Sequence, residues 1–60
     1  MTNKIVKTPE EKVREYYKGL IAAEDGMNQN GHNGASFRQG WQSVEVTLSL
    51  LGIKIEGVNA

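Results

Sequence analysis

The sequence predicts an all-α fold: a helical hairpin with short extended termini, two copies of which pack into a four-helix arrangement. Two segments carry apolar residues at helical spacing, and a segment rich in glycine and asparagine separates them. The chain has 60 residues, no cysteine and one histidine, so neither disulfides nor a structural zinc site can supplement its core. Because a domain of this length buries only about 60% of its unfolded surface, we expect residues 1–60 to form one domain that associates as a homodimer.

The first helix is predicted from residue 9 to about residue 24. Thr8 can accept a hydrogen bond from a first-turn amide, and Pro9 suits the first helical position. Glu11, three residues after Thr8, completes a capping box. At about 100° per residue, one stripe collects the apolar side chains, which are Val13, Tyr16, Tyr17, Leu20 and Ala23, with Met27 as a possible extension. Tyr16 lies nearer the edge of the stripe, where it can contact a partner.

The segment 25–35 is predicted to be a loop. Between Asp25 and Gly34 the chain has three glycines and three asparagines, which favour turns and positive φ. The loop precedes a helix N-terminus, whose free N–H groups attract anions. Arg38 can add a fork of donors there, and His32 and Asn33 lie close by in the sequence. A nucleotide- or anion-binding protein is therefore one alternative function.

The second helix is predicted from residue 36 to residue 51, with Ser36 and Gln39 as a second capping box. Gly52 suits the left-handed position that ends a helix. Gly40 inside the helix indicates the close approach of another helix or an aromatic ring, since a helical glycine costs about 1 kcal/mol relative to alanine. A seam spaced 4, 3, 4, 3 predicts helix packing, and its residues are Phe37, Trp41, Val44, Leu48 and Leu51.

Val46 and Leu50 lie on the opposite side of this helix from Trp41. One partner helix cannot bury both faces, so the second face indicates another protein surface. We therefore expect the core and the dimer interface together to comprise seven residues of this helix: Phe37, Trp41, Val44, Val46, Leu48, Leu50 and Leu51.

The tail 52–60 is predicted to be extended. Residues 53–56 alternate as a short strand does, and residues 4–7 are a possible pairing partner. A two-stranded ribbon of this length is unstable alone. It would have to pack on the helices or pair between protomers.

The composition argues against several classes of function. The seven basic and seven acidic side chains give a net charge of zero, whereas nucleic-acid binding domains are strongly basic. The loop is also longer than the three- or four-residue turn of a helix-turn-helix, so a DNA-binding regulator is only a second alternative. No apolar run reaches the roughly 20 residues of a membrane span, and the N-terminus lacks a signal peptide. We expect a cytoplasmic protein without a membrane partner.

The sequence offers no catalytic constellation. A triad of Ser36, His32 and Asp25 can be written down, but no nucleophile elbow is present to hold it. The loop also lacks the alternating acidic ligands and terminal glutamate of a calcium loop. We therefore expect a protein that is not an enzyme and has no catalytic residue, metal or cofactor. Tyr16, His32, Asn33 and Arg38 are the candidate contacts to a ligand or partner.

The segments Ser36–Trp41 and Leu51–Asn59, together with the size and neutral composition, resemble small phage or prophage proteins of Gram-positive bacteria. Among these the chain is similar in character to the short inhibitors that phages use against bacterial immunity, and the anti-Hachiman type is the nearest. The resemblance covers the chain as a whole and assigns no functional residue. It implies a cytoplasmic homodimer that blocks a host defence protein by binding to it.

Overall fold

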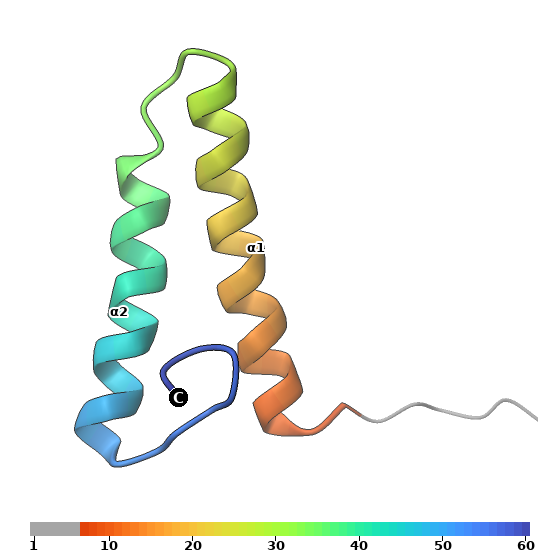
Figure 1. The fold of residues 1–60 in the computed structure, drawn as a ribbon, viewed down its shortest axis with the longest axis vertical. Coiled ribbons are helices and arrows are strands. Elements are labelled where there is room, and N and C mark those ends of the chain that lie inside the picture. Colours follow the sequence, from red (N-terminus) through yellow and green to blue (C-terminus); the bar gives the residue numbers. More distant parts are fainter. Residues whose placement is uncertain (1–6) are drawn as a thin grey trace, which may run out of the picture.

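The structure, a computed structural model, describes residues 7–60 and is a helical hairpin, as predicted. Helix α1 spans Pro9–Gln29 and helix α2 spans Ala35–Leu51, and the two run antiparallel (Figure 1). The described residues contain no strand. The tail after α2 curls back and contacts Arg14 of α1 (Figure 1). The four-helix dimer stays a prediction.

The start of α1 confirms the predicted capping box. The Thr8 hydroxyl accepts a hydrogen bond from the Glu11 amide at 3.2 Å, and Pro9 occupies the first turn. An exposed ion pair joins Lys7 to Glu15 at 2.5 Å across the same end of the helix.

The predicted end of this helix at residue 24 is wrong, because α1 continues to Gln29. The glycines and asparagines after residue 24 favour a turn, yet one helical glycine, here Gly26, costs only about 1 kcal/mol. The partly buried Met27 extends the packed stripe by one turn. The helix ends where Gly31 adopts a φ of 77°, and the His32 amide then donates to the Met27 carbonyl at 2.8 Å. The loop therefore covers residues 30–34 instead of 25–35.

The predicted capping box at the start of α2 is also wrong. The helix begins at Ala35, and its N-cap is Gly34, which offers no side-chain hydrogen bond. Asn33 replaces the expected Ser36, since its side-chain oxygen accepts from the Ala35 amide at 2.9 Å. The predicted end is correct: α2 stops at Leu51, Gly52 is left-handed, and the Ile53 amide donates to the Leu48 carbonyl at 2.9 Å.

Two glycines are expected to respond to alanine with opposite signs. A Cβ added at Gly34 would lie 2.9 Å from the Glu24 carbonyl oxygen and 3.0 Å from its Cγ, so the loop would have to move away from α1. We expect Gly34→Ala to lower the free energy of unfolding by about 1–3 kcal/mol. Gly19 is exposed and has open space around it, so Gly19→Ala should raise the same quantity by up to about 1 kcal/mol. Urea titrations of both variants test this pair, and equal effects would contradict the close approach at Gly34.

The hydrophobic core of the hairpin is small. Among residues 7–60, the buried apolar side chains are Tyr17, Leu48 and Ile55, and none of these is fully buried. Gly40 lies against α1, where a Cβ would be at ordinary contact distance, 3.4 Å, from the Leu20 side chain. Of the seven predicted core and interface residues, Leu48 is buried. Phe37, Trp41 and Val44 are partly buried, whereas Val46, Leu50 and Leu51 are exposed.

The tail packs on the hairpin without forming the predicted strand. Ile55 is only 3% exposed, the lowest value among the buried apolar residues. Asn59 holds the turn around it: its side chain accepts from the Ile55 amide and donates to the Ile53 carbonyl, both at 2.8 Å. The Arg14 Nε donates to the Glu56 carbonyl at 2.8 Å and so ties the tail to α1. Most of the proposed pairing segment at residues 4–7 lies outside the described residues.

Candidate functional site

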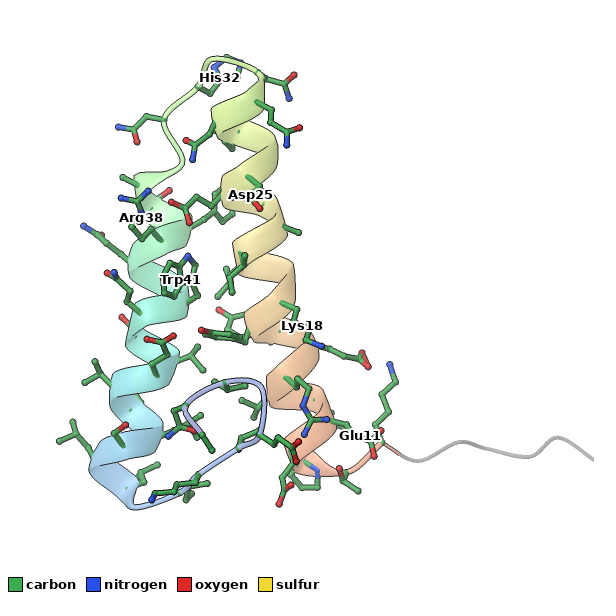
Figure 2. The ribbon with its side chains drawn as sticks, viewed as in Figure 1. Glu11, Lys18, Asp25, His32, Arg38 and Trp41 are labelled. Carbon is green, nitrogen blue, oxygen red and sulfur yellow. The ribbon has the colours of Figure 1, made fainter. Side chains whose placement is uncertain are left out.

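A buried carboxylate joins the two helices near the loop. Glu24 of α1 is only 6% exposed. Its two oxygens accept one hydrogen bond each, from the Arg38 Nε at 2.6 Å and from the Trp41 indole N–H at 2.8 Å. Figure 2 shows the Trp41 side chain on the side of α2 that faces α1, with Arg38 earlier along the same helix. Because a buried carboxylate is stable only when it is paired, this contact fixes how the two helices pack together.

A second polar contact lies further along the same interface. The Tyr17 hydroxyl donates a short hydrogen bond to the Glu45 carboxylate. The Tyr17 and Trp41 rings meet edge to face, with centroids 6.1 Å apart. The hydrogen bond to Glu45, followed by burial and by the carboxylate charge, raises the pKa of Tyr17. The hydroxyl therefore stays protonated and remains a donor across the interface.

The pKa of Glu24 lies below its ordinary value of 4.5, mainly because the Trp41 N–H binds the charged form, with help from Arg38 and against the effect of burial. The unfolded chain therefore binds the Glu24 carboxyl proton more tightly than the folded protein does. The charged Glu24 contributes its full share of the free energy of unfolding above the ordinary pKa, and this share is lost as the pH falls through the pKa of Glu24 in the folded protein.

We expect the melting temperature to fall more steeply in wild type than in Glu24→Gln between about pH 6 and about pH 3. Asp25→Asn, which changes the neighbouring exposed carboxylate, should keep the wild-type slope. Equal slopes in all three proteins would contradict the assignment.

Both charged residues of α2 thus bind residues of α1. Within Ala35–Leu51 the charged side chains are Arg38 and Glu45, and they bind Glu24 and Tyr17 respectively. The opposite side of α2 is uncharged. We call it the outer face and define it by Gln39, Gln42, Ser43, Val46, Thr47 and Leu50, all of which are exposed.

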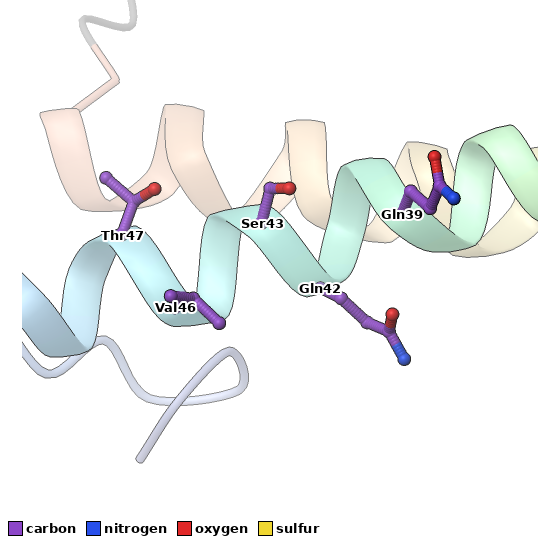
Figure 3. A pocket seen from close by; sticks show the side chains of 5 residues that line it. All are labelled: Gln39, Gln42, Ser43, Val46 and Thr47. Carbon is purple, nitrogen blue, oxygen red and sulfur yellow. The ribbon is translucent and has the colours of Figure 1, made fainter.

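The outer face combines a projecting apolar side chain with a shallow hollow. Leu50 is 82% exposed and Val46 is 57% exposed. The hollow lies one to two turns before Leu50, around the small Ser43 side chain (Figure 3), and its lining residues are Gln39, Gln42, Ser43, Val46 and Thr47. A surface helix ordinarily places its charges toward water and its apolar residues toward the core. On α2 both charged residues, Arg38 and Glu45, bind partners on α1, although the Arg38 side chain is still 56% exposed.

The four candidate contacts predicted from the sequence do not form one site. His32 and Asn33 lie in the exposed loop at the tip of the hairpin, and Asn33 caps α2. Arg38 binds the protein's own Glu24, so the anion beside this guanidinium is intramolecular. Tyr16 is 62% exposed on α1, and at about 1.5 Å per residue it lies roughly 20 Å from the end of that helix.

The sequence interpretation missed Glu24, although a signal for it was present. Glu24 follows Tyr17 by seven residues, and residues seven apart lie on the same side of a helix. A carboxylate on an apolar stripe must find donors on the facing helix. Trp41, already placed on the seam, carries an N–H that needs an acceptor when it is buried. Together these two observations indicate that each group needs a partner across the interface, although they do not select the pair.

Neither a metal cluster nor a membrane-spanning helix is found in residues 7–60. No group of three or more histidine, aspartate or glutamate side chains there converges closely enough to hold a metal ion. Neither α1 nor α2 has the length and apolar character required to span a bilayer.

Comparison with known proteins gives no assignment. No protein-family model, curated protein or solved structure shows significant similarity to this chain.

Proposed function

We propose that this chain acts as a homodimer that binds another protein and blocks it stoichiometrically, with no chemical step of its own. The favoured target is a host protein of antiviral defence, in keeping with the resemblance to small phage inhibitors. In this proposal the cytoplasm of the host cell is the site of action.

The arrangement of charge on α2 carries the proposal. An uncharged face with Val46 and Leu50 exposed is unusual on a monomer, because such patches mark protein-interaction sites. The small core supports the same conclusion. Only three apolar side chains are buried in the described part of the hairpin, so packing against a second copy would bury more apolar surface and raise the stability. We assign the outer face of α2 to the dimer.

The surfaces left for the target are the outer side of α1 and the loop. Tyr16 is the aromatic side chain most exposed there, and aromatic residues dominate the energetics of protein interfaces. Lys12 lies one turn before it on the same side of the helix and Glu15 lies beside it, so the surface has the apolar centre and polar rim that are common in recognition surfaces. The exposed His32 and Asn33 extend this surface to the tip of the hairpin.

Two measurements test the proposal. Sedimentation equilibrium over a range of concentrations should give a dimer, and a folded monomer at micromolar concentration would contradict the homodimer.

Affinity capture from a host lysate, followed by mass spectrometry, should recover one protein with the wild type and with Lys18→Ala, but much less of it with Tyr16→Ala. Strong thermal stabilisation by inorganic phosphate, abolished in Arg38→Ala, would instead favour the anion-binding alternative.

A further inference from the structure

We propose that two copies of this chain pair antiparallel through the outer face of α2, with Val46 on the two-fold axis and Leu50 of each copy packed against Ser43 of the other. This inference rests on the proposed homodimer and adds its geometry: which face pairs, in which direction and in which register.

The register follows from the spacing of the exposed residues. In an antiparallel pair centred on position 46, the residue n positions after the axis faces the residue n positions before it. Leu50 follows the axis by four positions, so it faces the region of Gln42 and Ser43 in the other copy. Leu50 is the most projecting of the large apolar side chains at 82% exposure, and the hollow around Ser43 can receive it (Figure 3). Each copy thus offers one knob and one hole.

A parallel pair of α2 helices would pack the same side chains less efficiently. It would place Leu50 beside Leu50 and the small Ser43 beside Ser43, so two large side chains would meet in one layer and a gap would open in another. Well-packed helices instead set large side chains against small ones. Antiparallel pairing also brings opposite ends of the two helix dipoles together.

Charge selects the outer face of α2 over the other exposed helical surface. The six residues of the outer face are uncharged, so a second copy can pack on it without opposing like charges. The exposed side of α1 carries Glu11, Glu15 and Lys18. Packing that side against a copy of itself would desolvate charges that have no assured partner, which costs free energy.

Cysteine variants test the geometry directly, because the natural chain has no cysteine to interfere. A disulfide requires Cα atoms within about 7 Å. Val46→Cys lies on the proposed axis and should form covalent dimers on mild oxidation. In Leu50→Cys the two thiols would be eight residues of helix rise apart, about 12 Å, so this variant should stay uncrosslinked. A mixture of Ser43→Cys with a size-tagged Leu50→Cys should give the mixed disulfide. Lys18→Cys, on the outside of α1, is the negative control.

The outcomes separate the geometry from the homodimer itself. The mixed disulfide without a Leu50→Cys homodimer supports the antiparallel register. Efficient Leu50→Cys and Ser43→Cys homodimers would overturn it in favour of parallel pairing, although the protein would still be dimeric by sedimentation. Crosslinking through Lys18→Cys alone would assign the interface to α1. A wild-type monomer by sedimentation would refute the proposed homodimer as well.

A charge placed in the knob provides a second readout. Leu50→Glu should convert the dimer to a folded monomer at concentrations where the wild type is dimeric, because two carboxylates would be buried in the interface without cationic partners. Lys18→Glu, which changes charge on the outside of α1, should remain dimeric. Circular dichroism confirms that both variants keep their helices. A Leu50→Glu variant that is still fully dimeric would overturn the assignment of this face.

Discussion

Trp41→Ala is expected to be the most damaging single substitution in the two helices, and to leave much of the chain unfolded at room temperature. The side chain is partly buried, packs edge to face on Tyr17 and donates its N–H to the buried Glu24. Truncating a packed tryptophan costs about 3–5 kcal/mol, and partial exposure places this site near the lower end. A chain of this size has a total stability of only roughly 3–9 kcal/mol, so the loss is a large fraction of the whole.

The ring and the N–H of Trp41 can be separated experimentally. Trp41→Phe keeps an aromatic ring for Tyr17 but removes the donor to Glu24, so its stability near neutral pH should fall less than that of Trp41→Ala. Because the Trp41 hydrogen bond is the main cause of the lowered pKa of Glu24, this variant should also begin to unfold at a higher pH on acidification. Urea titration at neutral pH and an acid titration by circular dichroism measure the two effects.

Tyr16→Ala is the matched control, since it removes an aromatic side chain that is 62% exposed on α1. Its free energy of unfolding should stay within about 0.5 kcal/mol of wild type, as for most surface substitutions. If Trp41→Ala were as stable as Tyr16→Ala, the packing between the helices would not depend on this ring.

Capping chemistry made the start of α1 predictable from the sequence. Thr8, Pro9 and Glu11 act within one turn, and no distant part of the chain can easily override them. The end of α1 was harder to predict because composition competes with packing there. The asparagines and glycines after residue 24 favour a turn, but the helix continues to Gln29, and Met27 in this added turn is partly buried. Only the left-handed Gly31 ends the helix.

The polar contacts between the helices follow from pairs of residues far apart in the sequence. A periodicity argument places Trp41 on the inner side of α2, but it does not choose Glu24 as its acceptor. Arg38 shows the consequence most clearly. Taken alone, it is a donor in the first turn of a helix and resembles part of an anion site. Once α1 is packed beside it, its partner is a carboxylate of the same chain.

The tail was the least predictable element, since alternation over four residues is a weak signal for a strand. A regular strand would place Ile53 and Ile55 on the same face, yet Ile55 is buried while Ile53 is 44% exposed. The segment has no neighbouring strand among the described residues, and a turn held by Asn59 follows it instead. The alternation therefore predicts neither the turn nor which of the two isoleucines packs on the helices.

Ile55→Ala is accordingly expected to release the tail from the hairpin and to destabilise the whole chain. Its side chain is 3% exposed, and removing a buried isoleucine side chain costs about 2–5 kcal/mol. The lower end applies here because a tail can detach without unfolding the helices, which limits the loss to the energy of docking. Ile53→Ala, a change of the same size at an exposed position, should cost less than about 1 kcal/mol.

Amide hydrogen exchange can distinguish detachment of the tail from unfolding of the chain. The Val58 and Asn59 amides donate to the Ile55 carbonyl at 3.0 and 3.2 Å, so their protection reports the docked turn. A loss of about 2 kcal/mol in docking should speed their exchange more than tenfold, because about 1.4 kcal/mol corresponds to a factor of ten. Amides in the middle of α1 should change less, since local opening of the tail does not expose them. If Ile55→Ala left the Val58 and Asn59 amides protected, the tail would be held by Arg14 and Asn59 alone, and burial of Ile55 would not be what docks it.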